Sequence, residues 1–257
     1  MHWRKGSPGN EIYRLPFLLT HHRKLISLDS IKEKEQGAGT MTQTIAILGA
    51  GRVGSSLARV AVASGYKVNV AGSGSADKIA LTAEILMPGA TPMTVAQAVK
   101  DAEIVILAVP LHKYTEIDPQ LLAGRIVIDT MNHWRPTNGA MDELDNDPRS
   151  TSEIIAEHFT GSRLVKTLNH IGYHEIEQDA VREAGKPRRA LAYASDDAKA
   201  GATVAGMLEN FGFDPVSLGT LSHGRILEPG QEAFGVWFSK PELEKLAREQ
   251  ISTAASH

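Results

Sequence analysis

The stretch TIAILGAGRVGSSLARVAVASGYKVNVAGSGS, residues 44–75, decides the fold of this chain. It begins with an apolar run over residues 44–48, typical of a buried strand, and a G-x-G-x-x-G turn follows at once. The pattern then predicts a helix over residues 53–63, ended by Gly65, and a second strand over residues 67–71. Strand, glycine turn, helix and strand within about 30 residues indicate the dinucleotide-binding unit of a parallel sheet.

Each glycine of this turn has a mechanical task in such a unit. Gly49 permits the tight turn, Gly51 lets the backbone approach a pyrophosphate, and Gly54 lets the helix pack closely on the strand. The start of the helix adds unpaired N–H groups and partial positive charge. The alternative is a tight strand–helix turn that binds nothing. The predicted cofactor-binding residues of the turn are Gly49, Ala50, Gly51, Arg52, Val53 and Gly54.

The tip of the second strand bears on the choice between NAD and NADP. NAD-binding proteins usually carry Asp or Glu there, which accepts hydrogen bonds from the ribose 2′-hydroxyl. This chain has no acid at the tip; Ser73 and Ser75 offer hydroxyl groups, and Lys78 lies one turn into the next helix. NADP(H) is therefore the expected cofactor. The alternative is that the two serines are only turn and cap residues, and competitive titration of NADPH against NADH separates the two.

The rest of the chain alternates apolar strands with helices, which indicates an α/β fold with a doubly wound (Rossmann) parallel sheet. After Asn169 the alternation loosens into a smaller C-terminal α/β segment. We therefore predict an NADP-binding domain over residues 41–169 and an acceptor-side domain over residues 170–257. The further strands are expected at 103–109, 125–129, 163–168, 190–194 and 214–218, and the further helices at 75–86, 95–102, 152–159, 196–211 and 241–250.

Residues 1–40 differ from the remainder of the chain. They are rich in charge and show no sustained period, so a disordered N-terminal extension is expected. The alternative is a docking arm that uses Trp3, Tyr13 and Phe17. Near the other end, the apolar stretch 234–238 is expected to be a subunit contact of a homo-oligomer, with ordinary core as the alternative.

Composition excludes several classes of protein. The net charge of −3 argues against a nucleic-acid partner, and the lack of cysteine excludes disulfides, thiolate metal sites and thiol nucleophiles. No apolar run approaches the roughly 18–20 residues that cross a bilayer, so a cytoplasmic protein without membrane contact is expected. His170 and His174 have the spacing of a helical metal pair, but Gly172 between them argues against helix, so no metal site is predicted.

Three strand ends carry the residues expected to face ligands, because ligands of open α/β sheets bind outside the carboxyl ends of the strands. The first end would line the nicotinamide ribose with its backbone, and the next two offer amides able to bind a flat polar ring. Each amide alone is also typical of a loop residue that bonds its own backbone. The residues are Val109, Pro110 and Leu111 for the cofactor, and Asn132, Asn169 and His170 for the substrate.

Residues 45–54, the pair Gly72 and Ser73 with Lys78, and residues 108–110 resemble the deazaflavin-dependent NADP oxidoreductase family. Members of that family exchange a hydride between NADPH and the 8-hydroxy-5-deazaflavin coenzyme F420. The resemblance continues more loosely to the C-terminal part and covers most of residues 43–230. Its later matches lie at 152–154, 165–169 and 212–216.

The resemblance implies a role for each matching residue. Gly51, Arg52 and Val53 would hold the pyrophosphate, Ser73 and Lys78 would hold the 2′-phosphate, and residues 109–111 would border the nicotinamide. One departure weakens this pattern: family members often have arginine directly after the position of Ser73, where this chain has Gly74. The change removes a bidentate grip on phosphate, and Arg52 is the residue expected to compensate.

The leading hypothesis is an NADP(H)-dependent oxidoreductase that passes a hydride to a small deazaflavin or flavin-like acceptor, with the deazaflavin coenzyme as co-substrate. Hydride transfer between two flat rings needs positioning and exclusion of water more than an acid or base, so no catalytic residue is predicted. One alternative is an NADPH reductase of the same fold that acts on free flavin, a ferric chelate or an imine. Another is a non-catalytic NADPH sensor. A sensor would not need the polar residues at the strand ends, which are Asn132, His133, Asn169 and His170.

Overall fold

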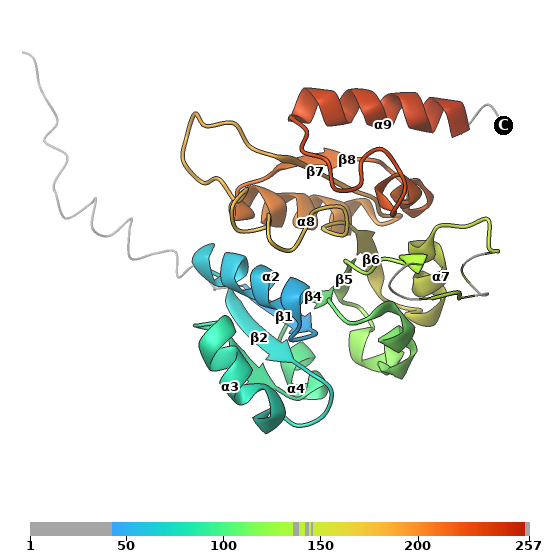
Figure 1. The fold of residues 1–257 in the computed structure, drawn as a ribbon. Helices are drawn as coiled ribbons and strands as arrows, with labels where there is room; N and C mark the ends of the chain where they lie inside the picture. The colour runs from blue at the N-terminus through green and yellow to red at the C-terminus, as the bar shows by residue number, and fades with distance from the viewer. Residues whose placement is uncertain (1–42, 136–138, 142–143, 145, 255–257) are drawn as a thin grey trace, which may run out of the picture. The chain divides into compact units, whose positions relative to one another are not determined.

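Six parallel strands form the main sheet of this protein, in the order β3-β2-β1-β4-β5-β6. The computed structural model describes residues 43–135, 139–141, 144 and 146–254, all within one compact unit (Figure 1). The strand order reverses between β1 and β4, which defines the topological switch point of a doubly wound sheet. The strands are β1 (Thr44–Leu48), β2 (Lys67–Ala71), β3 (Thr91–Met93), β4 (Ile104–Leu107), β5 (Ile126–Asp129) and β6 (Arg163–Lys166).

The predicted fold class is confirmed, with one strand that the sequence did not reveal. The short edge strand β3 has three residues including Pro92, so no apolar run marked it. The predictions for residues 1–40, both the extension and the docking arm, lie outside the described residues.

Two layers of helices cover the two faces of the sheet. Alternate residues of one strand point to opposite faces, so Ile45 and Ile47 of β1 pack in one core cluster while Ala46 and Leu48 pack in the other. Helices α2 (Arg52–Ala63), α3 (Asp77–Leu86) and α8 (Ala198–Phe211) contribute to the first cluster. Helices α4 (Val95–Lys100) and α7 (Thr151–His158) contribute to the second, with the short 3-10 helices η1 (Leu111–Glu116) and η2 (Pro119–Leu122).

The C-terminal part has a smaller sheet of its own. Strands β7 (Ala190–Tyr193) and β8 (Asp214–Ser217) pair in parallel, and Figure 1 shows α8 and α9 (Lys240–Ala254) on opposite faces of this pair. A single antiparallel bridge between Lys166 and Ala194 joins the two sheets. The predicted division between residues 169 and 170 stays a prediction.

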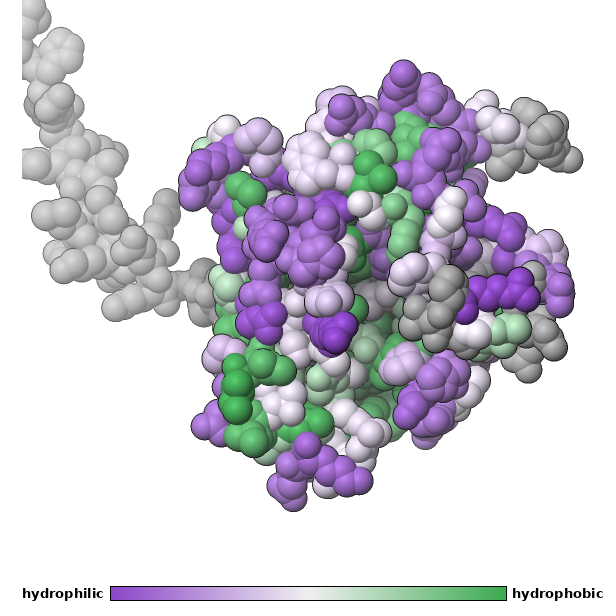
Figure 2. Space-filling model, in the orientation of Figure 1, coloured by the Kyte–Doolittle hydropathy of each residue, from purple (hydrophilic) through white to green (hydrophobic). Residues whose placement is uncertain are grey.

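Two exposed apolar surfaces stand out among the described residues. Figure 2 shows an apolar patch over α3, where Leu81 and Ile85 are about two-thirds exposed and Leu86 about half. In the stretch 234–238, Val236 and Trp237 are 44% and 46% exposed. The interpretation of that stretch as ordinary core is therefore wrong for these two residues, while the subunit contact stays a prediction.

Candidate functional site

The three glycines of the turn differ in what surrounds them. Gly49 has a φ of +125°, and a Cβ atom there would lie 2.2 Å from the carbonyl oxygen of Ala108. A Cβ atom on Gly54 would lie 1.8 Å from the carbonyl oxygen of Gly49. At Gly51, by contrast, no atom of the described chain comes within 4 Å of a Cβ. Two glycines are thus required by packing, and the middle one faces space.

The start of α2 leaves its backbone donors available. The helix begins at Arg52, and its N-cap residue Gly51 has no side chain that could accept a hydrogen bond. The first N–H groups of a helix need such a partner or a ligand. This end of α2 therefore has the donors that a pyrophosphate requires.

A cleft of about 390 Å³ lies against the glycine turn at the switch point of the sheet. We call it the switch-point cleft. It extends from the tip of β2, past the turn, to the end of β4 and the 3-10 helix η1. The predicted cofactor residues that line it are Gly49, Ala50, Gly51, Ser73, Val109 and Pro110.

The remaining predicted cofactor residues lie behind or beside this cleft. Gly54 and Leu111 are buried, Val53 packs against the core, and Ser75 is exposed. The predicted cap at Ser75 is wrong: α3 begins at Asp77, and its N-cap position is Ala76, which makes no side-chain cap. The chain makes a further turn after the strand tip, so the helix starts two residues later than the serine suggests.

Lys78 lies over the position where the family resemblance places an arginine. Gly74 lines the switch-point cleft with a φ of +99°, and a Cβ atom on it would come within 3.2 Å of Lys78 Nζ. A side chain at Gly74 would therefore be strained in its backbone and would compete with the lysine for the same space. Lys78, rather than Arg52 as expected, brings a positive charge to this rim, while the Arg52 side chain contacts Tyr173.

The two predicted amides meet, as their place at adjacent strand ends indicated. Asn132 Nδ2 donates to the carbonyl oxygen of Asn169 at 2.7 Å. Asn169 Nδ2 donates to Asn132 Oδ1 at 3.0 Å and to the carbonyl oxygen of Leu227 at 2.6 Å. Both hydrogens of the Asn169 amide nitrogen are thus engaged within the protein. The pair joins the loops after β5 and β6 to the 3-10 helix η3 (Leu221–Leu227).

His170 is part of the interior. It is 2% exposed, and its Nε2 accepts a hydrogen bond from the backbone N–H of Ala192 at 3.2 Å. Burial, with the nearby cations Arg189 and Lys166, lowers the pKa of His170 to about 3. The predicted contact between this ring and a substrate does not fit such burial. The sequence alone did not show whether a histidine that follows a strand is exposed at the end of the sheet or buried in the interior.

Acidification should destabilise the protein through His170. The pKa of His170 in the folded protein, about 3, lies below the ordinary histidine value of 6.5, so between these two pH values the unfolded chain binds a proton that the folded protein does not. Stability is fully present above pH 6.5 and falls as the pH is lowered towards 3, by up to about 1.4 kcal/mol per pH unit. Between pH 7 and pH 5, urea unfolding of the wild type should lose about 2 kcal/mol more than that of His170→Gln.

The exposed His112 provides a matched control for this pH dependence. His112→Gln should keep the slope of the wild type, since it leaves the buried His170 in place. Parallel pH profiles for the wild type and His170→Gln would contradict the assignment.

A buried ion pair between the ends of β5 and β6 was not predicted. Lys166 and Asp129 are both 0% exposed, with Lys166 Nζ 3.1 Å from Asp129 Oδ2. Lys166 also donates to the carbonyl oxygen of Met131 at 2.6 Å, and Asp129 accepts from Ser152 Oγ at 2.6 Å and from the Met131 N–H at 2.8 Å. The pair fixes the turn that leads to Asn132. A charged residue within an otherwise apolar strand was the one signal that could have revealed it.

Arg189 is a second buried cation that sequence reasoning missed. It is 1% exposed, and its Nη1 contacts Glu175 Oε2 at 2.9 Å and Asp179 Oδ2 at 2.8 Å. Its Nη2 donates to the carbonyl oxygen of Val236 at 3.0 Å. Arg189 thus fastens the segment after β6 to the loop before α9.

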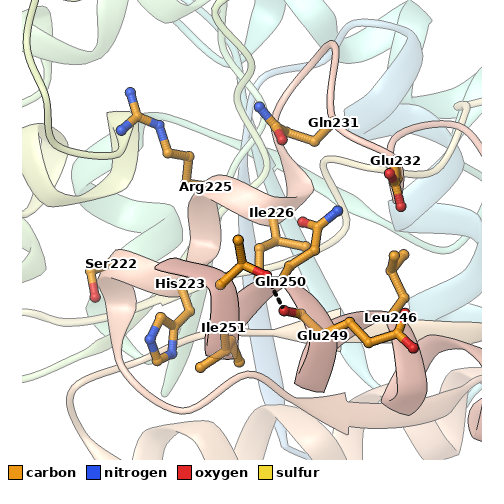
Figure 3. A pocket seen from close by; sticks show the side chains of 11 residues that line it. Ser222, His223, Arg225, Ile226, Gln231, Glu232, Leu246, Glu249, Gln250 and Ile251 are labelled. Carbon is orange, nitrogen blue, oxygen red and sulfur yellow. Dashed lines mark hydrogen bonds between the residues drawn. The ribbon is translucent and has the colours of Figure 1, made fainter. Parts of the chain in front are cut away.

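A larger cavity of about 570 Å³ lies elsewhere, between η3 and α9 (Figure 3). His223 and Arg225 from η3 and Glu249 from α9 are among its lining residues. None of the predicted site residues lines it. Size alone therefore does not select the candidate site, which is the switch-point cleft. Within the described ranges no helix is long and apolar enough to cross a membrane, and no group of three His, Asp or Glu side chains is arranged to hold a metal ion.

The strand order, the glycine turn and the cleft at the switch point together define a doubly wound Rossmann fold with a candidate nucleotide-binding site. The family model described as "NADP oxidoreductase coenzyme F420-dependent" matches residues 44–133. Over this range the chain is similar to that family, in agreement with the resemblance.

Solved structures resemble the chain over a longer range. The hypothetical protein SMa0349 from Sinorhizobium meliloti is 28% identical with a TM-score of 0.68, covering 77% of this chain and 96% of its own. A protein from Arthrobacter sp. FB24, provisionally named an F420-dependent NADP-reductase, is 25% identical with a TM-score of 0.62, covering 76% of this chain and 99% of its own. Metalloreductase STEAP3 of Rattus norvegicus is 30% identical over 187 residues, 72% of this chain, but the chain spans only 35% of that protein.

Proposed function

We propose that this protein transfers a hydride between NADPH and a deazaflavin or flavin-like acceptor at the carboxyl edge of the main sheet. The observation that carries the proposal is the switch-point cleft, which links the acid-free tip of β2, the glycine turn and the end of β4. When bound, NADP(H) supplies the hydride chemistry. The protein then needs to position two flat rings and exclude water rather than to move a proton.

The residues of the cleft fit the parts of this cofactor. The backbone N–H groups at the start of α2 would bind the pyrophosphate, with Gly51 leaving room for it. Ser73 and Lys78 would bind the 2′-phosphate at the tip of β2. Val109 and Pro110 would border the nicotinamide, with Leu111 packed behind them.

Lys78→Gln should weaken NADPH binding about 10-fold to 100-fold, the effect of losing one charge-assisted hydrogen bond of ~1.5–3 kcal/mol. NADH has no 2′-phosphate, so its affinity should not change. Fluorescence titration with both nucleotides measures the two constants, and Lys245→Gln on the exposed face of α9 is the matched control. An equal loss for NADPH and NADH would show that Lys78 does not bind the 2′-phosphate.

Stopped-flow oxidation of NADPH with a panel of acceptors tests the function itself. Rapid turnover with a deazaflavin is the expected result. Inertness toward deazaflavin combined with good turnover of FMN would reject the deazaflavin version of the proposal. Tight NADPH binding without turnover of any acceptor would instead favour a non-catalytic sensor.

Ferric chelate reduction is the second candidate. The sequence similarity to STEAP3, a metalloreductase by name, favours it. Direct reduction of a ferric chelate by NADPH, without added flavin or deazaflavin, would support this candidate over the first.

A further inference from the structure

A second cleft lies along α2 and adjoins the glycine turn. It measures about 380 Å³ and shares Ala50 and Gly51 with the first cleft. We call it the flank cleft. Its other lining residues are Arg52, Ser55, Ser56, Arg59, Leu86 and Tyr173.

The two arginines of the flank cleft differ in their partners. Arg59 is neutralised by Glu177: its Nε donates to Glu177 Oε2 at 2.8 Å, and a second contact joins Nη2 to Oε1. Arg52 forms no ion pair with any carboxylate in the described part of the chain. Its guanidinium lies 5.5 Å from the centre of the Tyr173 ring, and Nη1 donates to the tyrosine hydroxyl over 3.4 Å. The tyrosine thus orients Arg52 while leaving its charge uncompensated.

Ser55 supplies an independent sign of a missing partner. This residue lines the flank cleft and is 4% exposed, yet its hydroxyl has no hydrogen-bond partner among the described residues. Buried hydroxyl groups in native proteins are almost always bonded, because an unsatisfied one costs free energy. A serine hydroxyl beside an unpaired guanidinium and the first turn of a helix is a donor set that suits phosphate or carboxylate oxygens.

The direction of the Arg52 side chain assigns this anion to the acceptor rather than to the nicotinamide cofactor. The backbone of Arg52 faces the glycine turn, whereas its side chain contacts Tyr173, which follows β6 on the side of the C-terminal part. Further along the same segment, Glu175 accepts a hydrogen bond from Arg189, which also donates to the carbonyl oxygen of Val236. Strand β6 ends at the carboxyl edge of the main sheet, where the proposed reaction places the acceptor.

We propose that the Arg52 side chain, with Ser55 and Tyr173, binds an anionic group of the hydride acceptor, a phosphate or a carboxylate. This inference rests on the proposed function. It gives Arg52 two roles, since its backbone N–H serves the cofactor and its guanidinium serves the acceptor. It also implies that charged acceptors are bound in preference to neutral ones with the same ring.

FMN and riboflavin provide the test, because they differ only in a phosphate. Equilibrium quenching of flavin fluorescence, without NADPH, gives the affinity of each for the wild type, Arg52→Gln and Arg248→Gln. Arg248 lies exposed on α9, so its variant has the same change of charge away from the cleft. Arg52→Gln should weaken FMN binding about tenfold or more, the effect of one charge-assisted hydrogen bond, and leave riboflavin unchanged.

Separate titration of NADPH distinguishes the two sources of phosphate. In Arg52→Gln the Kd of NADPH should rise by a smaller factor than the Kd of FMN, because the backbone N–H that serves the cofactor remains. A loss of NADPH affinity with unchanged FMN affinity would place the guanidinium on the cofactor and overturn the proposal. Equal affinities of wild type for FMN and riboflavin, or no binding of FMN, would overturn it as well.

Ser55→Ala tests whether the hydroxyl group of Ser55 contributes to binding of the anionic group. The variant should keep the melting temperature of the wild type, since no hydrogen bond of the free protein is lost, but weaken FMN roughly threefold to tenfold. Unchanged FMN affinity would remove Ser55 from the site. Because binding is measured without turnover, an Arg52-dependent FMN site in a protein that oxidises no NADPH would leave the subsite standing and reject only the proposed function.

Discussion

Gly51→Ala should fold like the wild type and yet lose at least about 100-fold in NADPH affinity, which corresponds to about 2.7 kcal/mol. The backbone of Gly51, with φ −86° and ψ −166°, suits alanine, and its methyl group would meet no atom of the described chain. The same methyl group would occupy the path by which a pyrophosphate approaches the turn. Thermal unfolding without nucleotide and titration with NADPH measure the two effects separately.

Gly49→Ala and Gly54→Ala are the contrast to this variant. Their Cβ atoms would lie 2.2 Å and 1.8 Å from carbonyl oxygens, so both should unfold at clearly lower temperature even without nucleotide. If Gly51→Ala kept its affinity for NADPH, the pyrophosphate would not lie at this turn. If Gly51→Ala unfolded at a temperature as low as the other two variants, the inference that a methyl group fits at Gly51 would be wrong.

Lys166→Met should cost about 3–5 kcal/mol of unfolding free energy, because it leaves the carboxylate of Asp129 buried without its cation. Asp129→Asn should have a comparable cost, because it leaves the ammonium group of Lys166 buried without its carboxylate. Urea unfolding at pH 7 measures both. The double variant should recover most of the loss, since neither charge then remains in the interior.

An exposed pair supplies the control for this comparison. Lys245 and Glu249 lie 3.8 Å apart on α9 with both side chains mostly exposed, so Lys245→Met should leave stability unchanged within error. Additive costs in the double variant of Lys166 and Asp129 would show that the two charges do not compensate each other.

The fold was predictable where local patterns are strong. Strands β1 and β2 have the predicted bounds, because each is an apolar run bordered by glycine. Strands β4 and β6 end two residues before the predicted ends. Pairing with a neighbouring strand, which the sequence of one strand does not contain, decides where such an element stops. The same limit hid the edge strand β3.

The candidate site, like the fold, was predictable only where the pattern is local in sequence. The glycine turn and the tip of β2 were found because their chemistry is local. The contact of Arg52 with Tyr173 and the pair of Asp129 with Lys166 join residues far apart in sequence, so they depend on the strand order. His170 does follow a strand, as the sequence indicated. The sequence did not reveal that its ring points into the interior, where it accepts a hydrogen bond from the backbone of Ala192 in β7.

Lys166 also limits how this protein can be recombined with its relatives. The residue belongs to β6, bridges to Ala194 beside β7, and has Gly224 of η3 packed against its side chain. A chimaera that exchanged everything after residue 169 would have to supply a matching alanine, glycine and loop from another lineage. The C-terminal part therefore cannot be exchanged as an independent unit. If the flank cleft binds the acceptor as proposed, single substitutions around it are a more accessible route to new acceptor specificity than grafting of whole segments.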